Sequence, residues 1–560
     1  MTSCLSIYHP AGRVGLGENV FGKDVANFEL FQALARHGGL EQIDFLTHGE
    51  TPAEAIAAGL AEDKPLATRI TASHILNQEI PLRNGALLRG SHRLDELAWQ
   101  RRRAVGDQGY SLMGLIHTLA PPGMRHDITM AGVAPTQIWD ALICTSPSVQ
   151  KAVSALYDDW DAYLAERYGL AKRRRPQLPL VPLGVNGETL QACADRPDVR
   201  AEMRARLGAG PKDVIVLWVG RLSFFEKAFP QPMMQAVQAA ATRSGQRVHF
   251  AMVGWFPNGE TGEALYRQAA QIHAPGIDFH ILNGNDRDQL GQAWAAADIF
   301  LSLVDNVQET FGITPLEAMA AGLPVVVSDW DGYRYTVRNG EEGFLIPTLG
   351  GPEGALPNDL MAGHALGLTS YQKYVGAIAQ HTAVHVGRAA EALTQLILSP
   401  DLRRTMGAAG RRRIATTFDW KVVAPLYSDL AKELGQIRKA TQLDTQGSRR
   451  HPIKGDPFRD FAGFASETLT LETPLQLVGA VEPEALEKHL ADDLSLFASG
   501  MRATPIECGE ILGLLRSNGD QTVRSVLEAF PIHRRRRVQL TLMWLAKYGL
   551  IEWLHDQTAP

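Results

Sequence analysis

The 560-residue chain has few cysteines, and none of them lies in a pair-forming pattern. Cys4, Cys144, Cys193 and Cys508 are far apart, and none belongs to a CxxC pair. This spacing argues against a disulfide framework and against a cysteine-rich zinc site. The N-terminus has no basic start followed by an apolar run, so no signal peptide is expected. No stretch approaches the roughly 18 apolar residues that span a bilayer. These absences predict a cytoplasmic protein.

The chain also lacks a strong charge of one sign. It has 55 Lys and Arg against 61 Asp and Glu, which gives a net charge of −6. This balance argues against a protein that coats nucleic acid, although one basic patch would be compatible with it. Hydrophobic residues make up 45% and charged residues 21% of the chain, as in ordinary globular proteins. At roughly 100–200 residues per domain, the length predicts about three or four domains.

What the sequence does contain is a strand and helix alternation in two successive halves. The first half opens with a strand at 4–8, a glycine-rich loop and a helix at about 24–37. The expected strands of the second half are Val214–Val219, Val248–Val253, Ile299–Val304, Pro324–Ser328 and Phe344–Ile346. These strands are continuous apolar runs, which predicts parallel sheets covered by helices on both faces. Two such α/β units would face one another across a cleft, and ligands would bind beyond the carboxyl ends of the strands.

One segment after the expected strand at 299–304 indicates an anion site. Thr314 is a suitable N-cap, and Glu317 follows it at the capping-box spacing. The free N–H groups and the dipole of such a helix start suit a phosphate, and Gly312 would let the backbone approach it. Taken alone, Glu317 could simply close a capping box, and Glu309 could be a solvated loop carboxylate.

Two cations favour the anion site over these simpler interpretations. Gly220-Arg221 follows the strand at 214–219, and Lys227 lies in the same loop. Because parallel strands end at one edge of a sheet, this loop should lie beside the Glu309–Glu317 segment. Two cations and a helix N-terminus could together hold a diphosphate.

These motifs resemble the retaining, nucleotide-sugar-dependent glycosyltransferases of family 4, which have the GT-B fold. The resemblance rests on two glutamates eight positions apart, Glu309 and Glu317, and on Gly220-Arg221…Lys227 as a phosphate-binding loop. The stretches 317–327, 332–347, 140–148, 182–186 and 409–420 are also similar, so it covers residues 1 to about 436. It implies two facing Rossmann-like domains, 1–185 for the acceptor and 186–420 for the donor. A closing helix at about 421–436 would pack back on the first domain.

The resemblance also implies a role for individual residues. Arg221 and Lys227 would neutralise the donor diphosphate, Glu309 would bind hydroxyls of the transferred sugar, and Glu317 would hold the ribose hydroxyls. His117 would lie beside the donor sugar, although a histidine at a strand end is more often structural. Further donor-binding residues would be Phe311, Gly312, Ile313, Thr314 and Gly220, with Gly15, Gly17 and Gly22 of the N-terminal loop.

Two departures from the family pattern stand in the second half. Ala228 follows Lys227 where the family usually has glycine, and Gly332-Tyr-Arg-Tyr335 replaces a turn that often carries a glutamate. The resemblance implies no metal and no other cofactor, because fixed cations take the charge of the leaving group. Asp329-Trp-Asp331 has the spacing of a DxD metal motif, but it follows a buried strand, so a role in the loop is favoured.

The C-terminal region lies outside the resemblance. A polar linker at 437–457 precedes a small, mostly helical domain at 458–560. This domain is similar to a winged helix, with helices expected at about 508–516, 522–530 and 533–548 and a strand at 550–554. Arg534–Arg537 would suit DNA, but residues 451–560 hold 11 Lys and Arg against 15 Asp and Glu. That acidic balance favours a protein-contact or regulatory module, with DNA unfavoured and membrane contact not indicated.

The sequence therefore predicts a retaining glycosyltransferase that moves a hexosyl unit from a UDP-, GDP- or ADP-sugar to an acceptor hydroxyl. Its product would belong to polysaccharide, glycolipid or glycoconjugate synthesis. The alternative is a regulatory or nucleic-acid-binding protein that acts through its tail and keeps a degenerate sugar-binding core. Neither the sugar nor the acceptor follows from the sequence.

Overall fold

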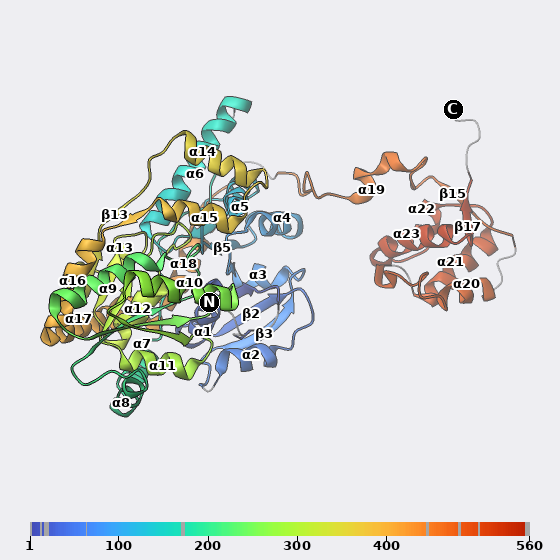
Figure 1. The fold of residues 1–560 in the computed structure, drawn as a ribbon. Helices are drawn as coiled ribbons and strands as arrows, with labels where there is room; N and C mark the ends of the chain where they lie inside the picture. The colour runs from blue at the N-terminus through green and yellow to red at the C-terminus, as the bar shows by residue number, and fades with distance from the viewer. Residues whose placement is uncertain are drawn as a thin grey trace. The chain divides into compact units, whose positions relative to one another are not determined.

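The computed structural model describes residues 3–11, 14–15, 22–62, 64–169, 174–443, 447–479, 483–501 and 504–554. The chain divides into two compact units, Met1–His451 and Pro452–Pro560. Figure 1 shows both units, with the N-terminus in blue and the C-terminus in red.

The first unit contains two six-stranded parallel sheets of the same topology. The first sheet has the order β3 (Arg69–His74), β2 (Gln42–Thr47), β1 (Cys4–Tyr8), β4 (Ala86–Arg89), β5 (Ser111–Leu115), β6 (Ala141–Ile143). The second has the order β9 (Asp278–Asn283), β8 (Val248–Gly254), β7 (Val214–Val219), β10 (Ile299–Ser302), β11 (Val325–Ser328), β12 (Gly343–Ile346). Both have the doubly wound Rossmann strand order, in which the first three strands are added toward one edge of the sheet and the next three toward the other. The predicted α/β class with two Rossmann-like domains, the GT-B arrangement, is confirmed.

Helices cover both faces of each sheet (Figure 1). Those of the first domain are α1 (Gly22–His37), α2 (Ala53–Ala61), α3 (Glu79–Asn84), α4 (Asp95–Ala104), α5 (Pro122–Val133) and α6 (Pro147–Tyr168). Those of the second are α7 (Gly187–Ala194), α8 (Pro197–Arg206), α9 (Pro230–Ser244), α10 (Gly259–His273), α11 (Arg287–Ala296), α12 (Ile313–Ala321), α13 (Tyr333–Thr336), α16 (Val386–Leu398) and α17 (Pro400–Arg413), followed by a π-helical turn at Ile414–Phe418.

The continuous apolar strands contribute side chains to two hydrophobic cores, one on each face of the sheet. In β7, Ile215 and Leu217 belong to one core, while Val214 and Val216 belong to the other. Successive strand residues point to opposite faces, so a strand between two helical layers must be apolar at every position. This requirement explains why the sequence pattern identified the central strands of the second domain.

The last helix of the unit, α18 (Trp420–Ala440), returns to the first domain. Ser428 Oγ donates to the carbonyl oxygen of Gly38 at 2.7 Å, and Arg438 Nη1 donates to Ser111 Oγ at 2.8 Å. The helix was predicted to end at about 436 and instead continues to Ala440, because nothing between these positions breaks a helix and Arg438 has partners on the first domain.

A helical insertion interrupts the second domain between β13 (Thr348–Leu349) and β14 (Ala383–Val384), which pair in antiparallel fashion. It consists of α14 (Ala355–Ala365) and α15 (Tyr371–Gln380). Several of its leucines are exposed, whereas Tyr374 and Val375 of α15 are buried. The insertion therefore packs on the domain through α15.

The second unit has its own small core around a three-stranded antiparallel sheet. The sheet has the order β16 (Gln521–Thr522), β15 (Pro474–Leu477), β17 (Ile551–Trp553). Its helices are α19 (Pro457–Asp460), α20 (Pro483–Leu490), α21 (Pro505–Asn518), α22 (Val523–Glu528) and α23 (Ile532–Lys547), with 3₁₀ turns at Ala462–Phe464 and Ser499–Met501. The three expected helices and the final strand are present, and the central strand β15 precedes them. The likeness to a winged helix stays a prediction.

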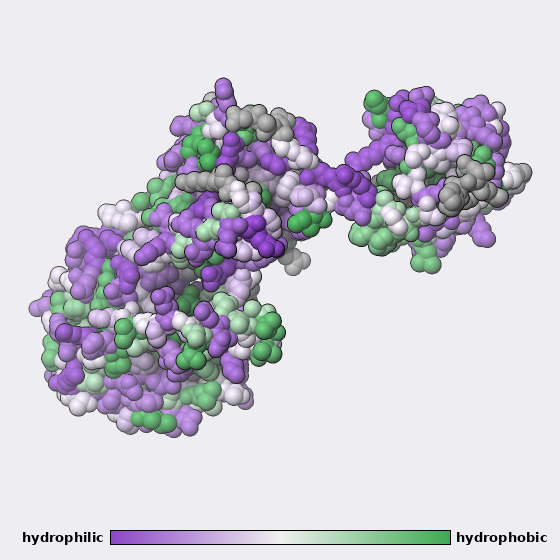
Figure 2. All heavy atoms as spheres, turned by 90° about the horizontal axis from the view of Figure 1, so that it is seen from above, coloured by the Kyte–Doolittle hydropathy of each residue, from purple (hydrophilic) through white to green (hydrophobic). Residues whose placement is uncertain are grey.

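The surface is largely polar, and no helix among the described residues has the length and apolar character that crossing a membrane requires. On the face seen in Figure 2, hydrophobic residues occur as small separate groups among hydrophilic ones.

Candidate active site

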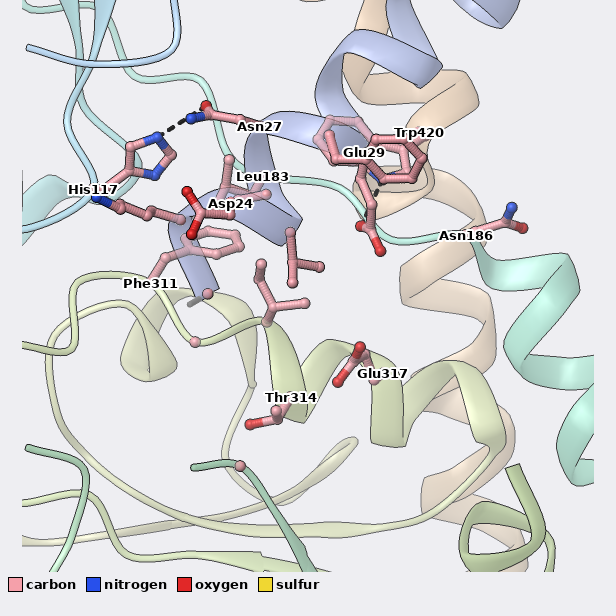
Figure 3. Close-up of a pocket in the computed structure, with 18 of the residues that line it drawn as sticks. Asp24, Asn27, Glu29, His117, Leu183, Asn186, Phe311, Thr314, Glu317 and Trp420 are labelled. Atoms are coloured by element: carbon pink, nitrogen blue, oxygen red, sulfur yellow. Dashed lines mark hydrogen bonds between the residues drawn. The ribbon is translucent and has the colours of Figure 1, made fainter. Parts of the chain in front are cut away.

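A cleft of about 1480 Å³ lies between the two Rossmann-like domains. The first domain lines it with the start of α1 and the loops after β4 and β5, and the second with the loops after β7 and β10 and the start of α12 (Figure 3). These are the loops at the strand ends where doubly wound sheets bind ligands. Of the residues predicted for the site, the cleft is lined by Gly22, His117, Gly220, Arg221, Lys227, Glu309, Phe311, Gly312, Ile313, Thr314 and Glu317. Gly15 does not line it, and Gly17 lies outside the described residues.

The start of α12 differs from the sequence prediction. Gly312, not Thr314, is the N-cap, and its φ of +83° is in the left-handed region that favours glycine. A Cβ atom at Gly312 would stand 1.8 Å from the Tyr333 ring, so this turn also needs the absence of a side chain. The predicted capping by Thr314 is therefore wrong. The Thr314 hydroxyl instead hydrogen-bonds to Tyr333, and no described side chain caps the first turn. The N–H groups of that turn remain available at the cleft.

The two predicted cations each pair with a carboxylate. Lys227 Nζ lies 3.0 Å from Glu309 Oε2, and an Arg221 guanidinium nitrogen lies 2.8 Å from Glu226 Oε2. The loop that carries them is tightly turned, because the Lys227 N–H donates to the Ser223 carbonyl oxygen at 2.9 Å. Ala228, which stands where glycine was expected, packs into the core. Each of these two positive charges is thus balanced by a carboxylate of the protein.

Glu309 is held as a carboxylate. Burial raises its pKa. The charge and hydrogen bond of Lys227 and the N–H groups of Phe311 and Thr310 lower the pKa by more than burial raises it, so the net shift is downward. The prediction placed Glu309 and Lys227 in one site, and the structure brings them into direct contact.

His117 is neutral and fixed in one orientation. Its Nε2 lies 3.0 Å from Asn27 Oδ1 and 3.1 Å from the Gly90 carbonyl oxygen, so Nε2 carries the proton and Nδ1 is an acceptor. Burial above all, with smaller effects of Lys23 and His92, lowers the pKa of His117 to about 4, against the opposing hydrogen bond to Gly90. His117 can therefore accept a hydrogen bond from a ligand but cannot supply positive charge at neutral pH.

The sequence reasoning missed Glu29 on α1. Glu29 accepts a hydrogen bond from Trp420 Nε1 at 3.2 Å and faces Glu317 across the cleft in Figure 3. Burial raises the pKa of Glu29 to about 7, and burial together with the charge of Glu29 raises that of Glu317 to about 8. The only signal in the sequence is a carboxylate close to the apolar face of α1.

Contacts between the two domains hold the rim of the cleft together. Ser146 Oγ donates to Asp331 Oδ1 at 2.6 Å, and Thr310 Oγ1 donates to the His117 carbonyl oxygen at 2.6 Å. Asp329 accepts from Arg334 Nε at 2.9 Å. Both carboxylates of the Asp329-Trp-Asp331 turn therefore have partners in the protein.

Comparison with known proteins agrees with this geometry over the second domain. Residues 199–349 match the family described as "Glycosyl transferases group 1". This match supports a glycosyltransferase. A D-inositol 3-phosphate glycosyltransferase of Nocardia farcinica (strain IFM 10152) is 31% identical over 188 residues, which cover 33% of this chain and 38% of that protein. A phosphatidyl-myo-inositol mannosyltransferase of Mycobacterium leprae (strain TN) is 41% identical over 90 residues, which cover 16% and 24%.

The extent of these matches is limited. The chain aligns with 33% to 38% of the length of the first four curated relatives. Among solved structures, a glycosyltransferase from Rickettsia africae ESF-5 aligns with a TM-score of 0.48 and 14% identity over 77% of this chain and 98% of that chain. The match to the glycosyltransferase family ends at residue 349, directly before the α14–α15 insertion.

Proposed function

We propose that the chain is a retaining glycosyltransferase that moves a hexosyl unit from a nucleotide-diphosphate sugar to an acceptor hydroxyl, in polysaccharide, glycolipid or glycoconjugate synthesis. The observation that carries the proposal is the convergence of Lys227, Arg221, Glu309 and the first turn of α12 in one cleft, within the segment that matches the glycosyltransferase family. The free cysteines fit a reducing compartment, so we place its activity in the cytoplasm.

The chemistry follows from where charge develops. The bond between the anomeric carbon and the phosphate oxygen breaks through an oxocarbenium-like state, and negative charge builds on the departing diphosphate. Arg221, Lys227 and the N–H groups of α12 stabilise that charge. The acceptor oxygen attacks the same face of the sugar, and its proton passes to a phosphate oxygen of the leaving group. Fixed cations take the role that a metal has in other transferases, so the proposal includes no metal or other cofactor.

The remaining residues would position the sugar. The Glu309 carboxylate and the unprotonated Nδ1 of His117 accept hydrogen bonds from its hydroxyls. Phe311, Gly312 and Ile313 offer their backbone to the phosphates, with Thr314 beside them.

The proposal is tested by hydrolysis of a panel of UDP-, GDP- and ADP-sugars. We expect turnover of at least one donor and its loss in Glu309→Ala and Lys227→Ala, with far-ultraviolet circular dichroism unchanged. The matched control is the exposed pair Asp429 and Lys432 on α18, which does not line the cleft and whose alanine variants should keep the wild-type rate. Wild-type rates in both site variants would refute the assignment.

For the C-terminal unit we propose contact with a protein, not with nucleic acid. Arg534 and Arg537 both pair with Glu507, and Arg534 also pairs with Glu510, so these arginines serve the unit's own packing. Large apolar side chains, such as those of Ile506 and Ile532, are exposed on it. Salt-dependent binding of the full chain to duplex DNA that is lost in Arg535→Ala/Arg536→Ala would contradict this choice.

A further inference from the structure

Two glutamates from different domains face each other across the cleft. Glu317 projects from α12 of the second domain and Glu29 from α1 of the first (Figure 3). Among the described residues, neither forms an ion pair with a lysine or arginine, and the charge of Glu29 acts directly on Glu317. Glu62 adds a further negative charge near Glu29, although Arg287 lies 3.9 Å from its carboxylate and Gln32 Nε2 donates to it at 3.2 Å.

Burial of two facing carboxylates is costly unless something satisfies them. Burial raises the pKa of both, and the charge of Glu29 raises that of Glu317 further, as expected for like charges in a partly buried site. Together they offer four acceptor oxygens, of which one on Glu29 already receives the Trp420 N–H. The remaining oxygens suit a group that is rich in hydroxyl donors and carries no negative charge of its own. Adjacent hydroxyls of a sugar ring meet this description.

The position along the cleft identifies which sugar this would be. Glu317 lies four residues, or about 6 Å, along α12 from Ile313 at the phosphate end. Trp255 and Asn285 also line the cleft. On the proposed function Glu309 and His117 hold the transferred sugar, so the sugar that remains for Glu317 in a nucleotide-diphosphate donor is the ribose.

We propose that Glu29 is a donor-specificity residue that holds the ribose diol together with Glu317, each carboxylate accepting from one hydroxyl. Residues of both domains would then bind the ribose. The donor would link the two domains, because hydrogen bonds to its hydroxyls replace the repulsion between the two carboxylates. This inference rests on the proposed function, because it assigns the ribose of the nucleotide that the function requires.

The alternative is that Glu29 only holds Trp420, and through it α18, in place. Binding measurements on the full chain separate the two. UDP, GDP and ADP are titrated by calorimetry, and the tightest binder is compared with its 2′-deoxy and 3′-deoxy forms. A hydroxyl that donates to a charged acceptor should make the ribose form at least roughly tenfold tighter than the deoxy form that lacks it.

The variants then assign each hydroxyl. Glu29→Ala should lose the preference for one hydroxyl and keep the other, and Glu317→Ala should do the reverse. Glu29→Gln keeps the shape of the side chain and should reduce the same preference several-fold. Trp420→Phe removes the hydrogen bond to Glu29 but not the carboxylate, so it should keep both preferences. Glu188→Gln is the control for loss of a negative charge elsewhere on the cleft wall.

The outcomes distinguish this inference from the proposed function. Tight binding with unchanged ribose preference in both Glu29 variants would overturn the role of Glu29 alone. Loss of the preference in Trp420→Phe to the same extent as in Glu29→Ala would also overturn it, in favour of a purely structural role. Failure of all three nucleoside diphosphates to bind the wild-type chain would instead contradict the proposed function.

Discussion

Asp305 offers a direct test of the electrostatics behind the site. It follows β10 and is 3% exposed. Its Oδ2 accepts from the Phe229 N–H at 3.3 Å, which ties the Lys227 loop to the Glu309 loop, and its Oδ1 has no partner among the described residues. Burial raises the pKa of Asp305 to about 8, although the N–H groups of Phe229 and of Asp305 itself partly oppose the shift. The carboxyl is therefore mostly protonated at neutral pH.

A raised pKa in the folded state makes stability depend on pH. The stabilising contribution of Asp305 is complete below the ordinary aspartate pKa of about 4 and is lost as pH rises toward about 8. Each unit in that window costs about 1.4 kcal/mol, which gives a loss of about 4 kcal/mol at pH 7. Asparagine keeps the acceptor for Phe229 but cannot ionise. Its amide N–H₂ would lack a partner, at a cost of about 1–3 kcal/mol that does not vary with pH.

Thermal unfolding of wild type and Asp305→Asn between pH 5 and pH 8 measures the difference. Because about 1 kcal/mol corresponds to roughly 2–4 °C for a domain of this size, the variant's melting temperature should rise relative to wild type by about 10 °C across this range. Asp401→Asn, an exposed carboxylate at the start of α17, is the control. A difference between wild type and Asp305→Asn that stays constant from pH 5 to pH 8 would refute the reasoning.

Two further predictions concern other carboxylates. If Glu317 accepts its ribose hydroxyl as a carboxylate, its pKa of about 8 means that binding of the preferred nucleoside diphosphate should tighten about tenfold between pH 7 and pH 9 by calorimetry, and Glu317→Gln should remove this slope. In the C-terminal unit, hydrogen bonds from Thr504 and Arg537 and the charge of Arg534 lower the pKa of Glu507 to about 2. The Glu507 carboxylate therefore stabilises the fold above about pH 4, and this stabilisation is lost as the pH falls toward 2. Glu507→Gln should therefore lower the melting temperature at pH 7, and the difference from wild type should shrink as the pH falls.

The sequence predicted those parts of the fold in which burial leaves a one-dimensional pattern. The central strands of the second sheet are buried on both faces, so their sequences are predominantly apolar throughout and do not alternate. The edge strands β3 and β9 are only half-buried and show no such run, and they were missed. Strand β2 is fully buried but contains Asp44, which the amide of Asn84 satisfies from another element. Such a partner cannot be read from local sequence.

The site was predictable where residues lie at strand ends and not where two domains meet. The cations and Glu309 follow strands of one sheet, so the topology brings them together. Glu29 meets Glu317 only because α1 and α12 face each other in the folded chain. The N-cap prediction failed because Gly312 can adopt a left-handed conformation, which starts the helix before Thr314.

The pairing of charges in the cleft bears on how a donor would bind. On the proposed function, a diphosphate does not meet bare cations, since Lys227 is held by Glu309 and Arg221 by Glu226. It must take these cations from the carboxylates, which lowers the net gain from charge attraction. The exchange has a second effect at Glu309: the N–H groups of Thr310 and Phe311 still hold that carboxylate once Lys227 has turned to the phosphate. Its Oε2 is then free to accept a hydroxyl of the sugar. A single displacement of Lys227 would thus prepare the phosphate and sugar sites together, so donor fragments that lack the diphosphate should bind poorly even though the sugar contacts are intact.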